Sequence, residues 1–320
     1  MSQKLSFNFK NYTLIDLLFI GYMTLLSILI LFFGRSVENW FFYIIAHAVI
    51  VGLIIVFVPI INERGRGVFK FLRWWYPILL FTFNYKSIDS FTHIIVNGWM
   101  DYQVIQFEEF IFGVDLSVWM ERFTTPLLTE VMKFFYFTYY LMIPIGAAFL
   151  YFAGKRRNYI RYLSAVCLTF YVSYLGFILY PVRGPRYELY DQYTKDYPVN
   201  IREFYGPYVE DDVAGKETMA LEGYIFTSFQ DKIMRYGSLH GGCMPSSHVA
   251  VAFVCMMMMW LYKRKVFYFY LPAVMILSVS VVYNRYHYIS DVFAGLIVGL
   301  LALWLTPRLQ KAWERYKYID

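Results

Sequence analysis

Two histidines and one aspartate near the end of the chain have a spacing that could support chemistry. His248 opens one apolar run, His287 closes the next, and Asp291 follows His287 by four residues. On a helix this spacing brings the carboxylate within reach of the imidazole. The contact would hold the ring in one tautomer and make it more basic. Such a histidine can attack phosphorus directly while a second histidine protonates the departing oxygen.

Three arginines and two serines near these histidines are candidate phosphate ligands. Arg183 and Arg186 follow an apolar run, and Arg285 lies two residues before His287. Arginine presents a planar fork of donors that matches phosphate oxygens. Ser246 and Ser247 add hydroxyl groups at an expected helix N-terminus, where free backbone N–H groups favour anions. The set fits phosphoryl transfer, and it requires no metal and no other cofactor.

The composition shows where this chemistry would take place. Hydrophobic residues make up 59% of the 320 residues and charged residues 16%, with a mean hydropathy of +0.45. Soluble domains average about 45–50% apolar and about 25% charged residues. We therefore expect an integral membrane protein whose partners are membrane lipids, and the net charge of +6 need not indicate nucleic acid. The three cysteines form neither a disulfide framework nor a Cys-x-x-Cys motif.

The apolar runs predict an all-α, polytopic membrane helical bundle with about eight transmembrane helices. A basic tripeptide at 263–265 separates the sixth and seventh runs, which should form a helical hairpin. This hairpin would return the two histidines to the same face of the membrane. The expected spans are residues 14–33, 40–61, 74–85, 127–152, 159–180, 249–262, 266–283 and 292–305.

The basic residues predict the orientation of these spans. With eight crossings, the two termini and the short basic loops all lie on one side, which the positive-inside rule makes cytoplasmic. The candidate site then faces the periplasm, the extracellular space or a lumen. Ionisable residues at membrane depth are costly and are by default functional.

Four regions follow from this arrangement. Residues 1–96 are expected to be N-terminal transmembrane helices, and residues 97–125 to form amphipathic helices at the membrane interface. Residues 126–306 would form the catalytic core, with a long outward loop at 187–242 that could roof the site. Residues 307–320 would be a cytoplasmic tail.

Three short segments resemble the signatures of the type 2 phosphatidate phosphatase superfamily. Pro245-Ser246-Ser247-His248 is similar to its second signature, usually Pro-Ser-Gly-His. The segment from His287 to Asp291, followed by Gly295, resembles the third, and residues 181–186 resemble the first. The resemblance covers residues 127–305 and implies a six-helix core acting on lipid phosphates. It also implies His287 as nucleophile, Asp291 as its orienting partner, His248 as general acid and Arg186 as phosphate ligand.

The chain also departs from this pattern. Val281 stands where the phosphatases usually carry an arginine, and Leu179 where they carry a lysine. Arg285 and Arg183 each lie four residues further along the chain. In these shifts the chain looks more like the inositol phosphorylceramide synthase branch, which transfers a phospho-headgroup between lipids. A headgroup transferase is therefore an alternative to a hydrolase.

Other classes of protein remain open. A non-enzymatic transporter or scaffold could keep the same fold, although transporters often place their polar groups at mid-membrane. An intramembrane serine protease would need Ser246 or Ser247 beside a histidine and would leave the arginines without a role. A metal hydrolase could use His248, His287 and Asp291 as ligands, and sensitivity to chelators would identify it.

Overall fold

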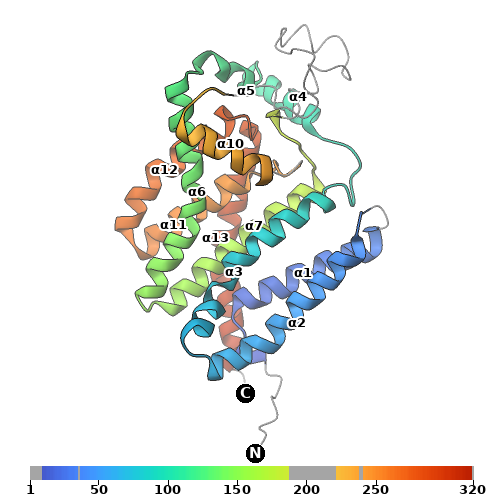
Figure 1. Cartoon of the computed structure of the whole chain (residues 1–320), viewed down its shortest axis with the longest axis vertical. Coiled ribbons are helices and arrows are strands. Elements are labelled where there is room, and N and C mark those ends of the chain that lie inside the picture. The colour runs from blue at the N-terminus through green and yellow to red at the C-terminus, as the bar shows by residue number, and fades with distance from the viewer. Residues whose placement is uncertain (1–8, 35–36, 187–220, 238–240, 319–320) are drawn as a thin grey trace, which may run out of the picture.

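The computed structural model describes residues 9–34, 37–186, 221–237 and 241–318, and this part of the chain is helical, with no strand (Figure 1). The predicted all-α fold is confirmed. The helices are α1 (Leu14–Phe33), α2 (Trp40–Arg64), α3 (Gly67–Ile88), α4 (Asp101–Phe112), α5 (Leu116–Trp119), α6 (Pro126–Phe152), α7 (Arg156–Leu179), α10 (Ile225–Gly237), α11 (Ser247–Tyr262), α12 (Arg264–Tyr283) and α13 (Ile289–Tyr318).

Six of these helices are long and apolar enough to cross a membrane, namely α1, α2, α6, α7, α12 and most of α13. The chain is therefore a multi-pass integral membrane protein. Two of the eight predicted spans have a different character. Helix α11 is apolar but has only 16 residues, and α3 carries Lys70, Arg73 and Lys86 among its apolar side chains. The prediction of about eight spans depends on these two helices.

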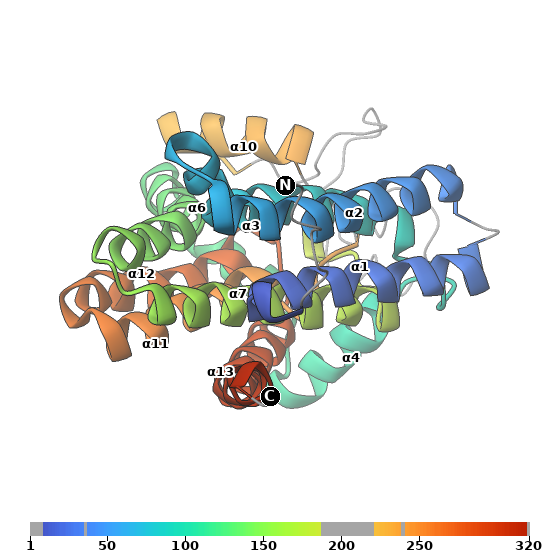
Figure 2. The same ribbon diagram turned by 90° about the horizontal axis from the view of Figure 1, so that it is seen from below.

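Helix α7 is the centre of the bundle. It packs against α1, α3, α6, α11 and α13, and Figure 2 shows it between the α2–α3 pair and α13. Gly176 on α7 and Gly295 on α13 let the segment that precedes α11 approach these two helices closely. A side chain at Gly176 would collide with the ring of Pro245, and a Cβ at Gly295 would lie 2.6 Å from the carbonyl oxygen of Ser246. These contacts seat the segment before α11 against α7 and α13.

A buried ion pair joins the N-terminal helices. Arg73 on α3 donates to the Asp16 carboxylate on α1 at 2.6 Å, and the Tyr76 hydroxyl donates to its other oxygen at 2.6 Å. Both charged side chains are almost fully buried, so removing one partner would leave an uncompensated charge. The pair therefore holds α3 against α1, and α3 also packs against α7.

The predicted boundary at residue 307 does not coincide with the end of a helix. Helix α13 continues through Pro307 to Tyr318. Its last turns are held to α7 by Arg157, which donates to Glu314 at 2.7 Å, and by Arg161, which donates to Gln310 at 3.1 Å. Residues 307–318 of the predicted tail are therefore the last turns of α13.

Residues 97–125, where the apolar spacing predicted amphipathic helices, contain α4, α5 and a 3-10 helix at Met120–Phe123. Helix α4 buries Val104 and Ile105 while it exposes Phe107 and Phe110, and α4 and α5 lie at the end of the bundle opposite the C-terminus (Figure 1). The exposed aromatic face is consistent with a membrane interface. The interfacial position itself stays a prediction.

Helix α10 lies within the segment that the sequence predicted to be a loop. It packs against α6, where the Glu130 carboxylate accepts from the backbone N–H groups of Phe226 and Thr227 at the start of the helix. A carboxylate there also complements the positive end of the helix dipole. Most of the remaining predicted loop, including His240, lies outside the described residues.

Candidate active site

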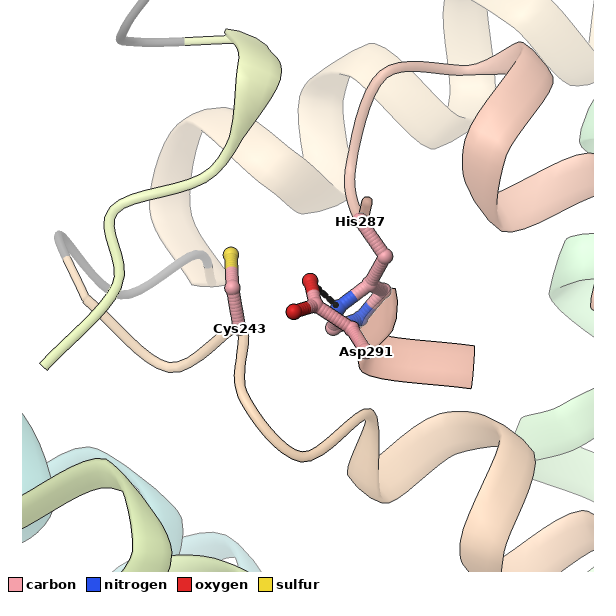
Figure 3. Close-up of side chains that lie close together, drawn as sticks. All are labelled: Cys243, His287 and Asp291. Atoms are coloured by element: carbon pink, nitrogen blue, oxygen red, sulfur yellow. Dashed lines mark hydrogen bonds and ion pairs between the residues drawn. The ribbon is translucent and has the colours of Figure 1, made fainter. Parts of the chain in front are cut away.

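The two histidines and the aspartate lie in one line at the centre of the site. Nδ1 of His287 lies 3.2 Å from Oδ2 of Asp291, which belongs to the first turn of α13, and Figure 3 shows the two side chains turned toward each other. Nε2 of His287 lies 3.4 Å from Nδ1 of His248, near the start of α11. The other nitrogen of His248 is 2.9 Å from the Tyr136 hydroxyl on α6. Three helices and one turn therefore assemble the line.

Burial gives His287 the properties of a neutral nucleophile. Only 2% of the residue is exposed, and burial lowers the pKa of its imidazole to about 4, so desolvation outweighs the increase in basicity that was expected from the Asp291 contact. The ring is therefore uncharged at neutral pH, and a lone pair is available. Asp291 occupies the Nδ1 side and is itself held by the Tyr288 backbone N–H at 3.0 Å. This leaves Nε2 as the nitrogen that can react.

A small cavity of about 40 Å³ opens beside the two histidines. Arg183 and Arg186 both line it, and the Arg186 guanidinium lies over the Tyr286 ring at 5.6 Å. Two arginines beside an uncharged imidazole can hold a phosphate close to a nucleophile. The other residues lining the cavity are Tyr85, Tyr136, Met234, Gly242, Cys243 and Tyr286.

Arg285, a predicted phosphate ligand, does not line this cavity. Its guanidinium donates to Glu121 at 3.0 Å, and its carbonyl oxygen accepts from the Arg186 backbone N–H at 2.9 Å. The backbone φ of Arg285 is 59°, in the left-handed region that non-glycine residues rarely adopt. The placement favours a role for Arg285 in shaping the turn that carries His287.

The two serines are also placed differently from the prediction. The Ser246 hydroxyl caps α11 by accepting from the Val249 backbone N–H at 3.4 Å, and Ser247 lines a second, larger cavity. Neither serine lines the cavity that contains the arginines. Among the hydrogen bonds of the described residues, none joins either serine to a histidine, so the geometry does not favour a serine nucleophile.

Asp101, at the start of α4, is a site residue that the sequence analysis missed. Its carboxylate accepts from the backbone N–H groups of Arg183 at 2.8 Å and Gly184 at 2.7 Å, and from the Tyr288 hydroxyl at 3.0 Å. Burial raises the pKa of this carboxyl, and the three donors act in the opposite direction. Asp101 thus joins the arginine loop to the residue that follows His287. Its only signal in the sequence was a carboxylate at the start of an amphipathic helix.

Glu108, about two helical turns after Asp101 on α4, contacts the start of α13. One carboxylate oxygen accepts from both the backbone N–H and the hydroxyl of Ser290, each at 2.7 Å. Ser290 immediately precedes Asp291, so Glu108 supports the orientation of the aspartate. Glu108 lies in the segment expected to form interfacial amphipathic helices, and the structure buries it fully.

The titration of Glu108 should affect the stability of the protein. Burial raises the pKa of Glu108 to about 7, compared with an unperturbed value of 4.5. Between these two values the folded state binds more protons than the unfolded state, so this contribution falls as pH rises from 4.5 to 7. Glu108→Gln removes the titrating group. We expect its thermal unfolding in detergent to match wild type at pH 5 and to show greater stability at pH 8, by about 2 kcal/mol. Parallel pH profiles for the two proteins would contradict this assignment.

Cys243 forms a third contact around the histidine–aspartate pair. Its sulfur, a nitrogen of His287 and an oxygen of Asp291 lie within 4.8 Å of one another (Figure 3). The thiol donates to the carbonyl oxygens of Arg183 at 3.1 Å and Tyr286 at 3.2 Å. Burial raises the pKa of the Cys243 thiol. A protonated thiol that bridges two loops suits this environment better than the thiolate that a metal would need.

Comparison with known proteins identifies the family. A family model described as the PAP2 superfamily matches residues 103–305, more than half of the chain. The chain belongs to the PAP2 superfamily. This PAP2 chain is thus a phosphatase- or phosphotransferase-type enzyme of lipid phosphates, and membrane lipids are its partners. The predicted superfamily resemblance is confirmed, while the assignment to the inositol phosphorylceramide synthase branch stays a prediction. Searches of the curated proteins and of the solved structures find no match.

Proposed function

We propose that this PAP2 enzyme cleaves the phosphate ester of a membrane lipid through a phosphohistidine on His287. The observation that supports this most directly is the line from Asp291 through His287 to His248, beside a cavity that Arg183 and Arg186 share. The line contains an orienting carboxylate, a neutral nucleophile and a second imidazole. The arginines supply positive charge where the phosphoryl oxygens would lie.

The proposed reaction has two steps. In the first, Nε2 of His287 forms a bond to phosphorus and the bond from phosphorus to the lipid oxygen breaks. His248 enters this step as an imidazolium beside the anionic phosphate, gives its proton to the departing oxygen and becomes neutral. In the second, His248 removes a proton from water or from an acceptor hydroxyl, whose oxygen attacks phosphorus and releases His287. With water the product is free phosphate. With a lipid hydroxyl as acceptor it is a new phospholipid.

We propose that the site faces away from the cytoplasm. Helix α7 begins next to Lys155 at a basic end of the bundle, where Arg157 pairs with Glu314. It ends at the loop that carries Arg183 and Arg186. The site and the basic loops are therefore at opposite ends of one spanning helix, which supports an outward site by the positive-inside rule. Turnover of a membrane-impermeant phosphate ester by sealed vesicles of known orientation tests this side.

The reaction type is tested with purified enzyme and a panel of phospholipids and lipid monophosphates. Free phosphate and new lipid species are followed together, with and without diacylglycerol or ceramide as acceptor. We expect free phosphate from at least one lipid monophosphate. A new phospholipid that forms only with acceptor would instead establish the headgroup transferase. If neither product forms across the panel, the proposed function is wrong and the scaffold interpretation gains support.

The same assay distinguishes a metal hydrolase. We expect activity to survive treatment with a chelator, since the nucleophile and the acid are both histidines. If a chelator removes activity and a divalent cation restores it, His287 and Asp291 are better explained as ligands together with Cys243, whose donor atoms lie close to theirs.

A further inference from the structure

A second cavity, of about 280 Å³, lies beside the candidate active site. Side chains from α3, α6, α7, α10 and α11 line it, and most of them are apolar or aromatic. Its volume is roughly twice that of an apolar cavity of about 150 Å³ that holds one benzene molecule. It therefore has room for a hydrocarbon segment of about ten carbon atoms. The apolar part of the lining comprises Ile78, Phe81, Ile143, Pro144, Phe170, Ile233 and Met234.

The two cavities meet at the general acid. His248 lines both of them, together with Tyr85 and Met234. The arginines line only the small cavity, and the apolar side chains of α3 and α7 line only the large one. A molecule that extends from the small cavity, lined by the arginines, into the large apolar cavity thus passes His248.

The large cavity reaches the surface between α3 and α6. Thr82 and Lys86 on α3 and Tyr140 on α6 line it and are exposed. Helix α3 packs mainly against α2 and α7, and α6 mainly against α7, α10, α11 and α12. The space between α3 and α6 therefore opens on the side of the bundle, where a lipid chain would arrive from the bilayer.

We infer that this cavity holds the hydrocarbon part of the lipid that leaves in the first step. The inference rests on the proposed function and specifies its substrate, because the large cavity lies on the side of the acid that protonates the leaving oxygen. The group that stays on phosphorus faces Arg183 and Arg186. The bond that breaks is thus the one between phosphorus and the lipid oxygen, and the first product is a lipid alcohol. Helix α3 lies outside the residues that the PAP2 family model matches, so the cavity proposed to select the chain is lined in part by a helix outside the matched region.

The test fills the cavity from α3 and compares a soluble with a long-chain substrate. Ile78 lines the cavity, whereas the neighbouring Leu79 is 65% exposed and does not. Ile78→Trp should lower kcat/KM for dioleoyl phosphatidate roughly 60-fold, because displacing about three methylenes costs about fourfold each. Turnover of p-nitrophenyl phosphate should stay within about twofold of wild type, which also shows that the site is folded. Leu79→Trp should leave both activities unchanged.

A binding measurement that needs no turnover completes the test. In the His287→Ala background, native mass spectrometry should detect bound dioleoyl phosphatidate, with affinity reduced by Ile78→Trp and retained with Leu79→Trp. Equal effects of the two tryptophans, or no effect of either, would overturn the inference even in an active enzyme. If wild type hydrolyses neither substrate but the binding difference persists, the proposed function fails while the chain-binding cavity stands.

Discussion

Replacing His287 by alanine is expected to abolish release of phosphate from every lipid phosphate that the wild-type enzyme hydrolyses. The alanine side chain removes Nε2, the one nitrogen placed to attack phosphorus, and leaves no covalent route. Loss of a nucleophile in an enzyme that forms a covalent intermediate costs about four to six orders of magnitude in kcat. The measurement is phosphate release in detergent micelles, with trapping of a ³²P-labelled intermediate on the wild-type protein.

Two further variants show that this loss is chemical. His287→Gln keeps a polar side chain beside Asp291 and should be equally inactive although it folds. His47 on α2 is also buried, and it contacts the Ser27 side chain at 3.1 Å, far along the chain from the site. His47→Ala should therefore retain turnover. Phosphate release by His287→Ala within tenfold of wild type would exclude His287 as the nucleophile.

Replacing Asp101 by asparagine is expected to lower kcat/KM about 100-fold in a protein that still assembles. The asparagine amide nitrogen would face either the Arg183 N–H or the pair formed by the Gly184 N–H and the Tyr288 hydroxyl. The amide N–H groups of the asparagine would then face buried N–H or O–H donors that have lost their acceptor. Each donor left without an acceptor costs about 1–3 kcal/mol. The arginine loop would move away from His287, and the measurement is the kinetics of phosphate release.

Asp115→Asn is the matched control for this change. Asp115 is another buried carboxylate from the same region, but it caps α5 by accepting from the backbone N–H groups of Ser117 at 2.7 Å and Val118 at 3.4 Å. Asparagine is as good an N-cap as aspartate, so activity should stay near wild type. If both substitutions reduce kcat/KM equally, the effect comes from general destabilisation and Asp101 has no specific link to the arginine loop.

Local patterns in the sequence were sufficient for the class of fold and for the contact between His287 and Asp291. Apolar runs of membrane length and basic connecting segments predict a helical membrane bundle without any knowledge of packing. The four-residue spacing predicted that His287 and Asp291 would meet, and their side chains are 3.2 Å apart, although His287 lies in the turn before α13 and only Asp291 is on the helix. The basic tripeptide between α11 and α12 likewise predicted that His248 and His287 would lie at the same face of the membrane.

Contacts between distant segments carry no such local signal. The Asp101 and Glu108 carboxylates support segments that are 82 to 187 residues away in the chain, and the sequence indicated only that both lie in an expected amphipathic stretch. Arg285 was expected to bind phosphate, yet it has a left-handed backbone and its guanidinium pairs with Glu121, which follows α5 in the chain.

The large cavity depends on how α3 and α6 are held apart, and no periodicity within either helix encodes that separation. Helical spacing reports which residues share a face. Which face meets which partner depends on the packing of the whole bundle.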